Sequence, residues 1–175
     1  MFGFETDRLL IRPWQPDDRD AFRSIGADPE VMHYLRGGRP YSEEEIDEWF
    51  TRQARQLAEH GVCMGAVIEK ATGDLVGISG IQPLGTTGYL EIGWIFKRHT
   101  WGRGYATEAG GAAMNHVLET LAQPRVVAII DIDNEPSKRV AGRLGMQYDG
   151  RYTGVQLGHR KPDILVDLFY RDRTA

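Results

Sequence analysis

The stretch KRHTWGRGYATEAGGAAMNHVLETL, residues 97–121, carries four glycines in a segment that otherwise has the pattern of a helix. Two of them, Gly102 and Gly104, stand just before the expected helix start at Tyr105. Glycine permits positive φ angles and lets another group approach the backbone closely. Successive N–H groups at such a turn form an anion-binding concavity, and the helix N-terminus adds its positive dipole end. The spacing therefore predicts a pyrophosphate site, although an ordinary tight turn between a strand and a helix would use the same glycines.

Positive charge flanks this turn, because Arg98 and Arg103 stand on either side of Gly102. The turn has no Gly-Lys-Ser/Thr sequence, which the P-loop of nucleotide-binding proteins requires. Only two of its glycines have the spacing of the dinucleotide-binding fingerprint. The predicted anion site is therefore of neither common type.

Strand and helix patterns alternate from this stretch to both ends of the chain. The clearest helix begins at Ser42, a predicted N-cap with Glu45 at capping-box spacing, and ends at Gly61, a predicted C-cap. The expected elements are, in order, a strand in 6–14, two short helices in 16–35, a helix in 42–61, strands in 62–70, 74–83 and 88–97, a helix from 105 to about 121, a strand at 125–131, a helix at 134–144, and strands in 146–154 and 163–172. This order predicts an α/β protein with a mixed sheet and helices packed on it, in one domain over residues 1–175.

The composition excludes several classes of protein. The formal net charge is −4, whereas a nucleic-acid-binding face would normally be basic. The single cysteine, Cys63, allows no internal disulfide framework, and the histidines lack metal-ligand spacing. No apolar run of about 18 residues occurs, and the first residues carry charge where a signal peptide would be apolar. We therefore expect a cytoplasmic protein that binds no metal, no nucleic acid and no membrane.

Three motifs resemble the Gcn5-related N-acetyltransferases (GNAT). HTWGRGYATEA, residues 99–109, is similar to the loop that binds the pyrophosphate of acetyl-CoA in that family, whose pattern is Gln or Arg, two residues, Gly, one residue, and Gly or Ala. His99 stands where the family usually has Gln or Arg, a mild departure because backbone N–H groups make most of the phosphate contacts. ETDRLLIRPWQPDD (residues 5–18) and NEPSKRVAGRLGM (residues 134–146) resemble the RimJ/RimL-type subfamily of ribosomal-protein N-terminal acetyltransferases. The resemblance covers essentially the whole chain.

This resemblance implies a largely antiparallel sheet in which the strand ending near Lys97 and the strand 125–131 are parallel neighbours that splay apart at their C-terminal ends. The pantetheine arm of acetyl-CoA would enter the gap and pair with the backbone of Ile95, Phe96 and Lys97. The loop that would hold the pyrophosphate consists of Arg98, His99, Thr100, Trp101, Gly102, Arg103, Gly104, Tyr105 and Ala106. Asn134 matches a family asparagine that contacts the cofactor, and it is equally well placed to cap the helix that follows.

Acetyl transfer to an amine needs two proton movements. An amine with a pKa of about 8 to 10 must lose a proton before it attacks, and a thiolate leaving group with a pKa of about 8.5 departs more easily beside a proton donor. Glu91, an ionisable residue in an otherwise apolar strand, is the predicted base, and the resembling subfamily carries a similar glutamate there. Two alternatives are a residue that only binds the ammonium group and a solvent-facing strand residue.

The predicted proton donor is Ser137. Many members of the family place a tyrosine seven residues after the asparagine, but Ala141 occupies that position here. Ser137 matches a serine that the ribosomal subfamily has been thought to use, and a serine that caps the helix or faces water is the alternative. Tyr148 is a reserve donor, and direct protonation by water is a further alternative.

Together these features predict an acetyl-CoA-dependent N-acetyltransferase that transfers the acetyl group directly to a primary amine in a ternary complex. The acceptor would be a protein N-terminus or a small-molecule amine, and the enzyme a monomer or a homodimer. The acidic run from Glu43 to Glu45 is the dipole-favoured first turn of a helix, or part of a cleft that attracts a cationic amine. The alternative function is a non-catalytic acyl-CoA-binding or sensor domain, which Ala141 in place of tyrosine would fit.

Overall fold

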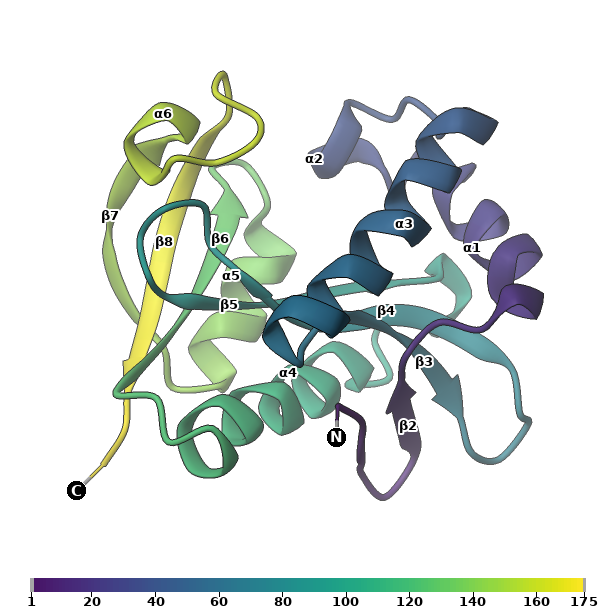
Figure 1. Ribbon diagram of the computed structural model, residues 1–175, viewed down its shortest axis with the longest axis horizontal. Coiled ribbons are helices and arrows are strands. Elements are labelled where there is room, and N and C mark those ends of the chain that lie inside the picture. Colours follow the sequence, from purple (N-terminus) through teal and green to yellow (C-terminus); the bar gives the residue numbers. More distant parts are fainter. Residues whose placement is uncertain (1, 175) are drawn as a thin grey trace.

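The computed structural model describes residues 2–174, whose strands form one eight-stranded sheet in the order β1-β2-β3-β4-β5-β6-β8-β7 (Figure 1). Neighbouring strands are antiparallel except β5 and β6, which are parallel. The strands are β1 (Phe4–Glu5), β2 (Leu9–Arg12), β3 (Met64–Glu69), β4 (Leu75–Pro83), β5 (Leu90–Phe96), β6 (Arg125–Asp131), β7 (Gln147–Thr153) and β8 (Leu165–Asp172). The helices are α1 (Arg19–Gly26), α2 (His33–Arg36), α3 (Glu43–His60), α4 (Tyr105–Asn115), α5 (Glu135–Arg143) and α6 (Gly154–Leu157).

The order of elements agrees with the sequence prediction, to which the structure adds β1 and α6. These two elements have two and four residues, too few for a periodic pattern to reveal them. Both predicted ends of α3 are confirmed, since Ser42 and Glu45 form a reciprocal capping box and Gly61 takes the left-handed conformation at φ +71°. The helix expected to reach about residue 121 is regular to Asn115 and then continues as one π-helical turn, His116–Thr120.

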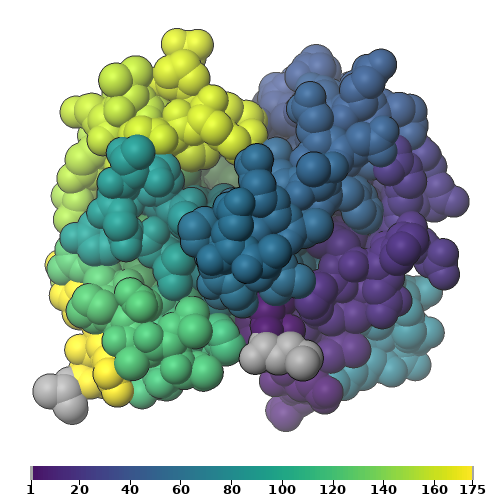
Figure 2. All heavy atoms as spheres, viewed as in Figure 1, coloured from purple at the N-terminus to yellow at the C-terminus, as the bar shows by residue number. Residues whose placement is uncertain are grey.

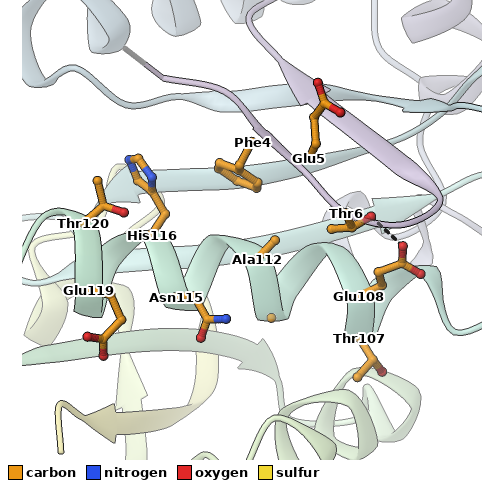
Figure 3. A pocket seen from close by; sticks show the side chains of 11 residues that line it. Phe4, Glu5, Thr6, Thr107, Glu108, Ala112, Asn115, His116, Glu119 and Thr120 are labelled. Atoms are coloured by element: carbon orange, nitrogen blue, oxygen red, sulfur yellow. Dashed lines mark hydrogen bonds between the residues drawn. The ribbon is translucent and has the colours of Figure 1, made fainter.

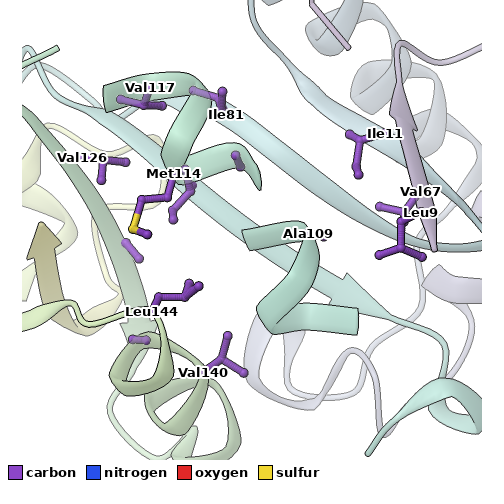
Figure 4. Close-up of a cluster of buried hydrophobic side chains, with 14 of the residues drawn as sticks. Leu9, Ile11, Val67, Ile81, Ala109, Met114, Val117, Val126, Val140 and Leu144 are labelled. Atoms are coloured by element: carbon purple, nitrogen blue, oxygen red, sulfur yellow. The ribbon is translucent and has the colours of Figure 1, made fainter. Parts of the chain in front are cut away.

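Successive side chains of β5 point to opposite faces of the sheet, and different helices cover each face. Ile92 and Phe96 belong to a buried cluster that packs against α4 and α5, part of which is drawn in Figure 4. Ile95 belongs to a cluster formed with α1 and α3. Val127, which alternates with residues of the α4/α5 cluster along β6, packs on the other face with Leu157 of α6. The α1/α3 face is therefore covered in two parts, and Figure 2 shows a narrow hollow between α3 and the segments around α6 and the start of β8.

Strands β5 and β6 pair only near their starts. Leu90 lies opposite Val126, and Glu91 lies opposite Val127. Beyond these positions β5 stays paired with β4 as far as Phe96, and β6 stays paired with β8. The C-terminal parts of β5 and β6 therefore diverge. This geometry confirms the splayed parallel pair that the sequence predicted, and the sheet has a gap at that point.

Candidate active site

The glycine-rich loop has a backbone that requires its first two glycines. Gly102 (φ +77°) and Gly104 (φ +81°) lie in the left-handed region, which few other residues adopt. Gly104 is the N-cap of α4, and its carbonyl accepts a hydrogen bond from the Glu108 N–H (3.0 Å). The N–H groups of the turn between them have no acceptor within the helix and point out of its N-terminal end. A Cβ on Gly102 would meet no atom within 4 Å, so open space lies beside this bare backbone.

Gly110, a later glycine of the same stretch, is required for a different reason. A Cβ on Gly110 would lie 3.0 Å from Trp94 of β5 and 3.1 Å from Leu144 at the end of α5. Gly110 therefore lets α4 approach the sheet and α5 closely, whereas Gly102 and Gly104 are needed by the turn. The unusual glycine content of the stretch thus combines a packing requirement with a loop requirement.

Carboxylates from other elements hold the two arginines that flank the loop. Arg98 pairs with Glu30 in the connection between α1 and α2 (2.9 Å). Arg103 pairs with Glu69 at the end of β3 (2.7 Å), and the Tyr105 hydroxyl donates to the same carboxylate. These ion pairs tie the loop to the rest of the fold.

The backbone at the end of β5 is only partly free to pair with a ligand. The Lys97 N–H donates to the Val76 carbonyl of β4 (2.9 Å). Because hydrogen-bonding direction alternates along an antiparallel strand, the backbone groups of Ile95 also face β4 and those of Phe96 face the gap. The Phe96 carbonyl accepts a hydrogen bond from the indole Nε1–H of Trp101 (2.8 Å), whose side chain is 50% exposed. Of the three residues predicted to pair with the pantetheine arm, Phe96 is thus the one placed to do so.

Glu91 lies at the last paired position of β5 and β6, on the α1/α3 face. It is only 7% exposed, so its interpretation as a solvent-facing strand residue is wrong. One carboxylate oxygen accepts a hydrogen bond from Nε2 of Gln82 (3.2 Å), its neighbour across the β4–β5 pair. Burial raises the pKa of Glu91 to about 7, while the Gln82 hydrogen bond and the charge of Arg160 act in the opposite direction. A carboxyl group with this pKa can exchange a proton near neutral pH.

Ser137 and Asn134 lie at the start of α5, on the opposite face of the sheet. The side chain of Asn134 accepts a hydrogen bond from the Ser137 N–H (3.1 Å), so Asn134 does cap the helix. Ser137 Oγ accepts a hydrogen bond from Trp94 Nε1 (3.3 Å), which leaves the hydroxyl proton available for donation. Trp94 belongs to the splayed part of β5. Ser137 therefore stands beside the gap on the α4/α5 face, and Glu91 stands beside it on the α1/α3 face.

Three other side chains considered from the sequence are placed away from this chemistry. Tyr148 is on β7, which β8 separates from β6, and it is 56% exposed and packs against Phe169 (5.6 Å between ring centroids). Ala141 is a fully buried residue of α5, in the cluster that the helix forms with α4. Cys63 is buried, and burial raises the pKa of its thiol to about 12. A thiol with this pKa stays protonated at neutral pH, as a structural cysteine does.

Two of the three carboxylates in the acidic run at the start of α3 form ion pairs within the protein. Glu43 pairs with Arg23 (2.8 Å), and Glu45 pairs with Arg36 (2.6 Å) and Arg39 (2.9 Å). These carboxylates are committed to α1 and α2, which argues against the alternative that they attract a cationic amine. Among residues 2–174, no three His, Cys, Asp or Glu side chains gather as metal ligands would. No helix in this described part is both long and apolar enough to cross a bilayer.

A wide groove elsewhere on the surface does not coincide with the candidate site. It has a volume of about 580 Å³ and lies between the N-terminal segment and α4 (Figure 3). Phe4 stacks on His116 at one end of it (5.6 Å between ring centroids), and Thr6 donates to Glu108 at the other. None of the residues that the sequence predicted for the site lines this groove. The chemistry of the predicted residues therefore points to the gap between β5 and β6 and not to this groove.

Sequence reasoning missed two partners of the candidate catalytic residues, Gln82 and Trp94. Gln82 reaches Glu91 because of the register of β4 against β5, which places the two residues side by side. Trp94 reaches Ser137 because α5 packs across the splayed part of β5. A register assigned to the predicted strand pair from the sequence would have signalled Gln82, whereas no local pattern signals the contact between Trp94 and Ser137.

Comparisons with known proteins agree with this geometry. The family described as "Acetyltransferase (GNAT) domain" matches residues 8–147. The uncharacterized protein YkkB of Bacillus subtilis strain 168 is 34% identical over 148 residues, which are 82% of this chain and 84% of that protein. The crystal structure of an acetyltransferase from Agrobacterium tumefaciens strain C58 has a TM-score of 0.81 and 27% identity, covering 99% of this chain and 95% of its own. RimL, a ribosomal L7/L12 α-N-protein acetyltransferase solved with coenzyme A, has a TM-score of 0.77 over 96% of both chains, and at 17% identity it shows a likeness of fold alone.

Proposed function

The chain belongs to the GNAT family of acetyltransferases, and on this premise we propose that it transfers an acetyl group from acetyl-CoA directly to a primary amine in a ternary complex. The observation that carries the proposal is the position of Glu91 and Ser137, which flank the gap between β5 and β6 from opposite faces of the sheet. An acceptor that arrives over the α1/α3 face and a thioester held from the α4/α5 face would meet in this gap.

Features of the chain on the α4/α5 side fit acetyl-CoA. The loop from Arg98 to Ala106 offers a bare backbone at Gly102 and Gly104 and the N-terminus of α4, which suit a pyrophosphate. The diverging strands leave room for the pantetheine arm, with the backbone of Phe96 directed toward it. Asn134 caps α5 and would contact the cofactor through its amide as well. When bound, acetyl-CoA supplies the thioester to be attacked and the thiolate that leaves.

We assign Glu91 as the base that receives a proton from the acceptor's ammonium group. Its pKa of about 7 leaves an appreciable fraction ionised near neutral pH, so it can receive a proton from the amine nitrogen, directly or through one water molecule. Gln82 holds one of its oxygens, which leaves the other for the acceptor. The same carboxylate would attract the ammonium group before the proton moves.

We assign Ser137 as the proton donor that faces the leaving sulfur. Its Oγ already accepts the Trp94 indole hydrogen, and this orients the hydroxyl so that its own proton is available. A hydrogen bond to the developing thiolate stabilises the transition state more than the ground state, which is the requirement for a gain in rate. An N–H of β5 that faces the gap would stabilise the oxyanion formed on the acetyl group.

The acceptor in this proposal is a peptide N-terminus or a small-molecule amine. The active unit is one domain over residues 1–175, a monomer or a homodimer, in the cytoplasm, where a lone reduced Cys63 would persist. The motifs at residues 5–18 and 134–146 are the features that resemble the RimJ/RimL-type subfamily, to which we propose that the chain belongs.

A screen of N-terminal peptides and small amines with acetyl-CoA, monitored by the thiol released, tests the proposal. We expect thiol release with at least one acceptor class, and Glu91→Gln should lower its rate by roughly 10²-fold near neutral pH. Glu119→Gln removes an exposed carboxylate beyond α4 and should leave the rate within about twofold. If Glu91→Gln raises KM alone, Glu91 anchors the acceptor and is not the base. Binding of acetyl-CoA without thiol release from any amine would indicate a non-catalytic acyl-CoA-binding domain.

A further inference from the structure

Three positively charged side chains belong to elements that border the hollow in the α1/α3 face (Figure 2). Arg52 lies on α3, and Arg160 and Lys161 lie on the loop between α6 and β8. Lys161 Nζ donates to the Leu35 carbonyl of α2 (3.1 Å), which joins this loop to the helices on the other side. In Figure 2 the loop, in yellow, and α3, in blue, border the hollow from opposite sides. The loop that carries Arg160 and Lys161 and the helix that carries Arg52 therefore border one hollow in Figure 2, and we call these three cations the rim.

The cations of this rim act on one another and on the predicted base. Burial, and after it the charge of Arg160, lowers the pKa of Arg52 to about 10. Burial lowers the pKa of Lys161, as do the charges of Arg160, Arg36, Arg52 and Arg39. The charge of Arg160 also opposes the burial that raises the pKa of Glu91. The three cations therefore lie close enough to act on one another, and Arg160 lies close enough to act on Glu91.

No carboxylate of residues 2–174 forms an ion pair with Arg52, Arg160 or Lys161. Glu48, one turn earlier on α3, acts on Arg52 without contacting it. The chain has 25 acidic and 21 basic side chains, so a shortage of carboxylates does not explain this arrangement. Like charges held together are unfavourable unless an opposite charge joins them.

Arg52 is held in a position from which it can bind an anion. Its guanidinium lies over the Trp49 ring (4.9 Å to the centroid), which fixes the side chain against α3. Its Nε is buried and has no hydrogen-bond partner, and Oε1 of Gln56, one turn later, is in the same state. A guanidinium with unused donors matches the oxygens of a carboxylate or a phosphate.

We propose that the amine acceptor of this enzyme carries a carboxylate or phosphate group, which Arg52, Arg160 and Lys161 bind while the amine faces Glu91. This inference rests on the proposed function and adds the chemical class of the acceptor. The same cations repel a second ammonium group, so polyamines are poor acceptors. The selectivity is electrostatic and therefore weakens as the salt concentration rises.

Matched acceptor pairs test the inference and separate the two anionic groups. The carboxylate arm compares the tripeptide amide Ala-Glu-Ala-NH2 with Ala-Gln-Ala-NH2, and the phosphate arm compares O-phosphoethanolamine with ethanolamine. We expect kcat/KM to be at least about tenfold higher for the anionic member of at least one pair, with most of the difference in KM. Equal kcat/KM values within twofold in both pairs overturn the inference and leave the proposed function standing.

Variants locate the preference on the rim. Arg160→Gln removes an exposed side chain, so it should fold normally and reduce the preference to about threefold or less. Arg52→Gln should do the same, whereas Arg143→Gln on α5, at the other face, should preserve it. A preference that survives in both rim variants contradicts the assignment.

A binding measurement tests the rim without any turnover. With coenzyme A at saturation, so that the pyrophosphate loop is filled, citrate and inorganic phosphate should raise the melting temperature of the wild type by about 3 °C or more. Sodium chloride at equal ionic strength is the control. The Arg52→Gln/Arg160→Gln double variant should lose this response. An equal response in the double variant overturns the inference, and an absence of thiol release with every amine would separately remove the proposed function.

Discussion

Replacing Glu91 with glutamine should remove a pH-dependent loss of stability. Burial raises the pKa of Glu91 from its ordinary 4.5 to about 7. Between these pH values the folded protein keeps the carboxyl proton while the unfolded chain has released it. The folded state therefore binds more protons, and the free energy of unfolding falls as pH rises through this range. Glutamine does not ionise, so the variant lacks this fall.

The magnitude follows from the two pKa values. A tenfold change in proton affinity corresponds to about 1.4 kcal/mol, so the interval from 4.5 to about 7 amounts to about 3 kcal/mol. The contribution is fully present below pH 4.5 and is lost above about pH 7. The free energy of unfolding of Glu91→Gln minus that of the wild type should therefore rise by about 3 kcal/mol between pH 4.5 and 8. Other titrating groups occur in both proteins and cancel in this difference.

Urea denaturation followed by tryptophan fluorescence at pH 4.5, 6, 7 and 8 measures this difference. Glu119→Gln, which replaces an exposed carboxylate, is the matched control and should track the wild type at every pH. A difference for Glu91→Gln that stays constant within about 0.5 kcal/mol would show that Glu91 titrates normally in the folded protein. That result would refute the argument that burial sets its pKa, and with it the assignment of Glu91 as a base active near neutral pH.

Variants at Gly102, Ser137 and Asn134 address the other side of the sheet. Gly102→Ala and its control Gly61→Ala both place a Cβ at a positive φ with no other atom within 4 Å, so both variants should lose a similar amount of stability. Only Gly102→Ala should weaken acetyl-CoA binding, by about tenfold or more as measured by calorimetry. Ser137→Ala should lower kcat and leave acetyl-CoA affinity within a few-fold, and an unchanged kcat in single-turnover experiments would reduce Ser137 to a residue of the helix start. Asn134→Asp should keep the cap, because Asp and Asn cap equally well, while Asn134→Ala should cost about 1 kcal/mol of stability. If the Asn134 amide contacts the cofactor, Asn134→Asp should also bind acetyl-CoA at least about threefold more weakly.

The parts of this molecule that the sequence predicts well are those with local causes. Ser42, Glu45 and Gly61 mark the ends of α3 through interactions within a few residues, and the structure has all three as expected. Gly102 and Gly104 predict a left-handed turn from local causes too, because glycine itself can adopt the positive φ angles that the turn requires. The splaying of β5 and β6 depends on contacts between distant segments. It was predicted from the motifs of a known family and not from hydrophobic periodicity.

The parts that the sequence left open depend on contacts between distant segments. Whether Glu91 faces water or the interior follows from how α3 and α6 cover the sheet, and alternation along β5 alone allows either. The engagement of the Phe96 carbonyl by Trp101 depends on how the loop folds back on the strand. The cationic rim joins Arg52 to Arg160, which no spacing in the sequence relates. A prediction of acceptor class therefore needed the structure.

Arg160 connects the two electrostatic features of the α1/α3 face. Burial alone would raise the pKa of Glu91 further, and the positive charge of Arg160 is one of the two influences that restrain it. If an anionic group of the acceptor binds Arg160, that charge is partly neutralised and the proton affinity of Glu91 rises. The carboxylate then becomes a stronger base when the ammonium group lies beside it. An acceptor without an anionic group leaves the charge of Arg160 in force and meets a weaker base. Because a higher pKa also lowers the fraction of Glu91 that is ionised near neutral pH, the two effects on the rate oppose each other, and the rim is expected to select acceptors mainly through binding.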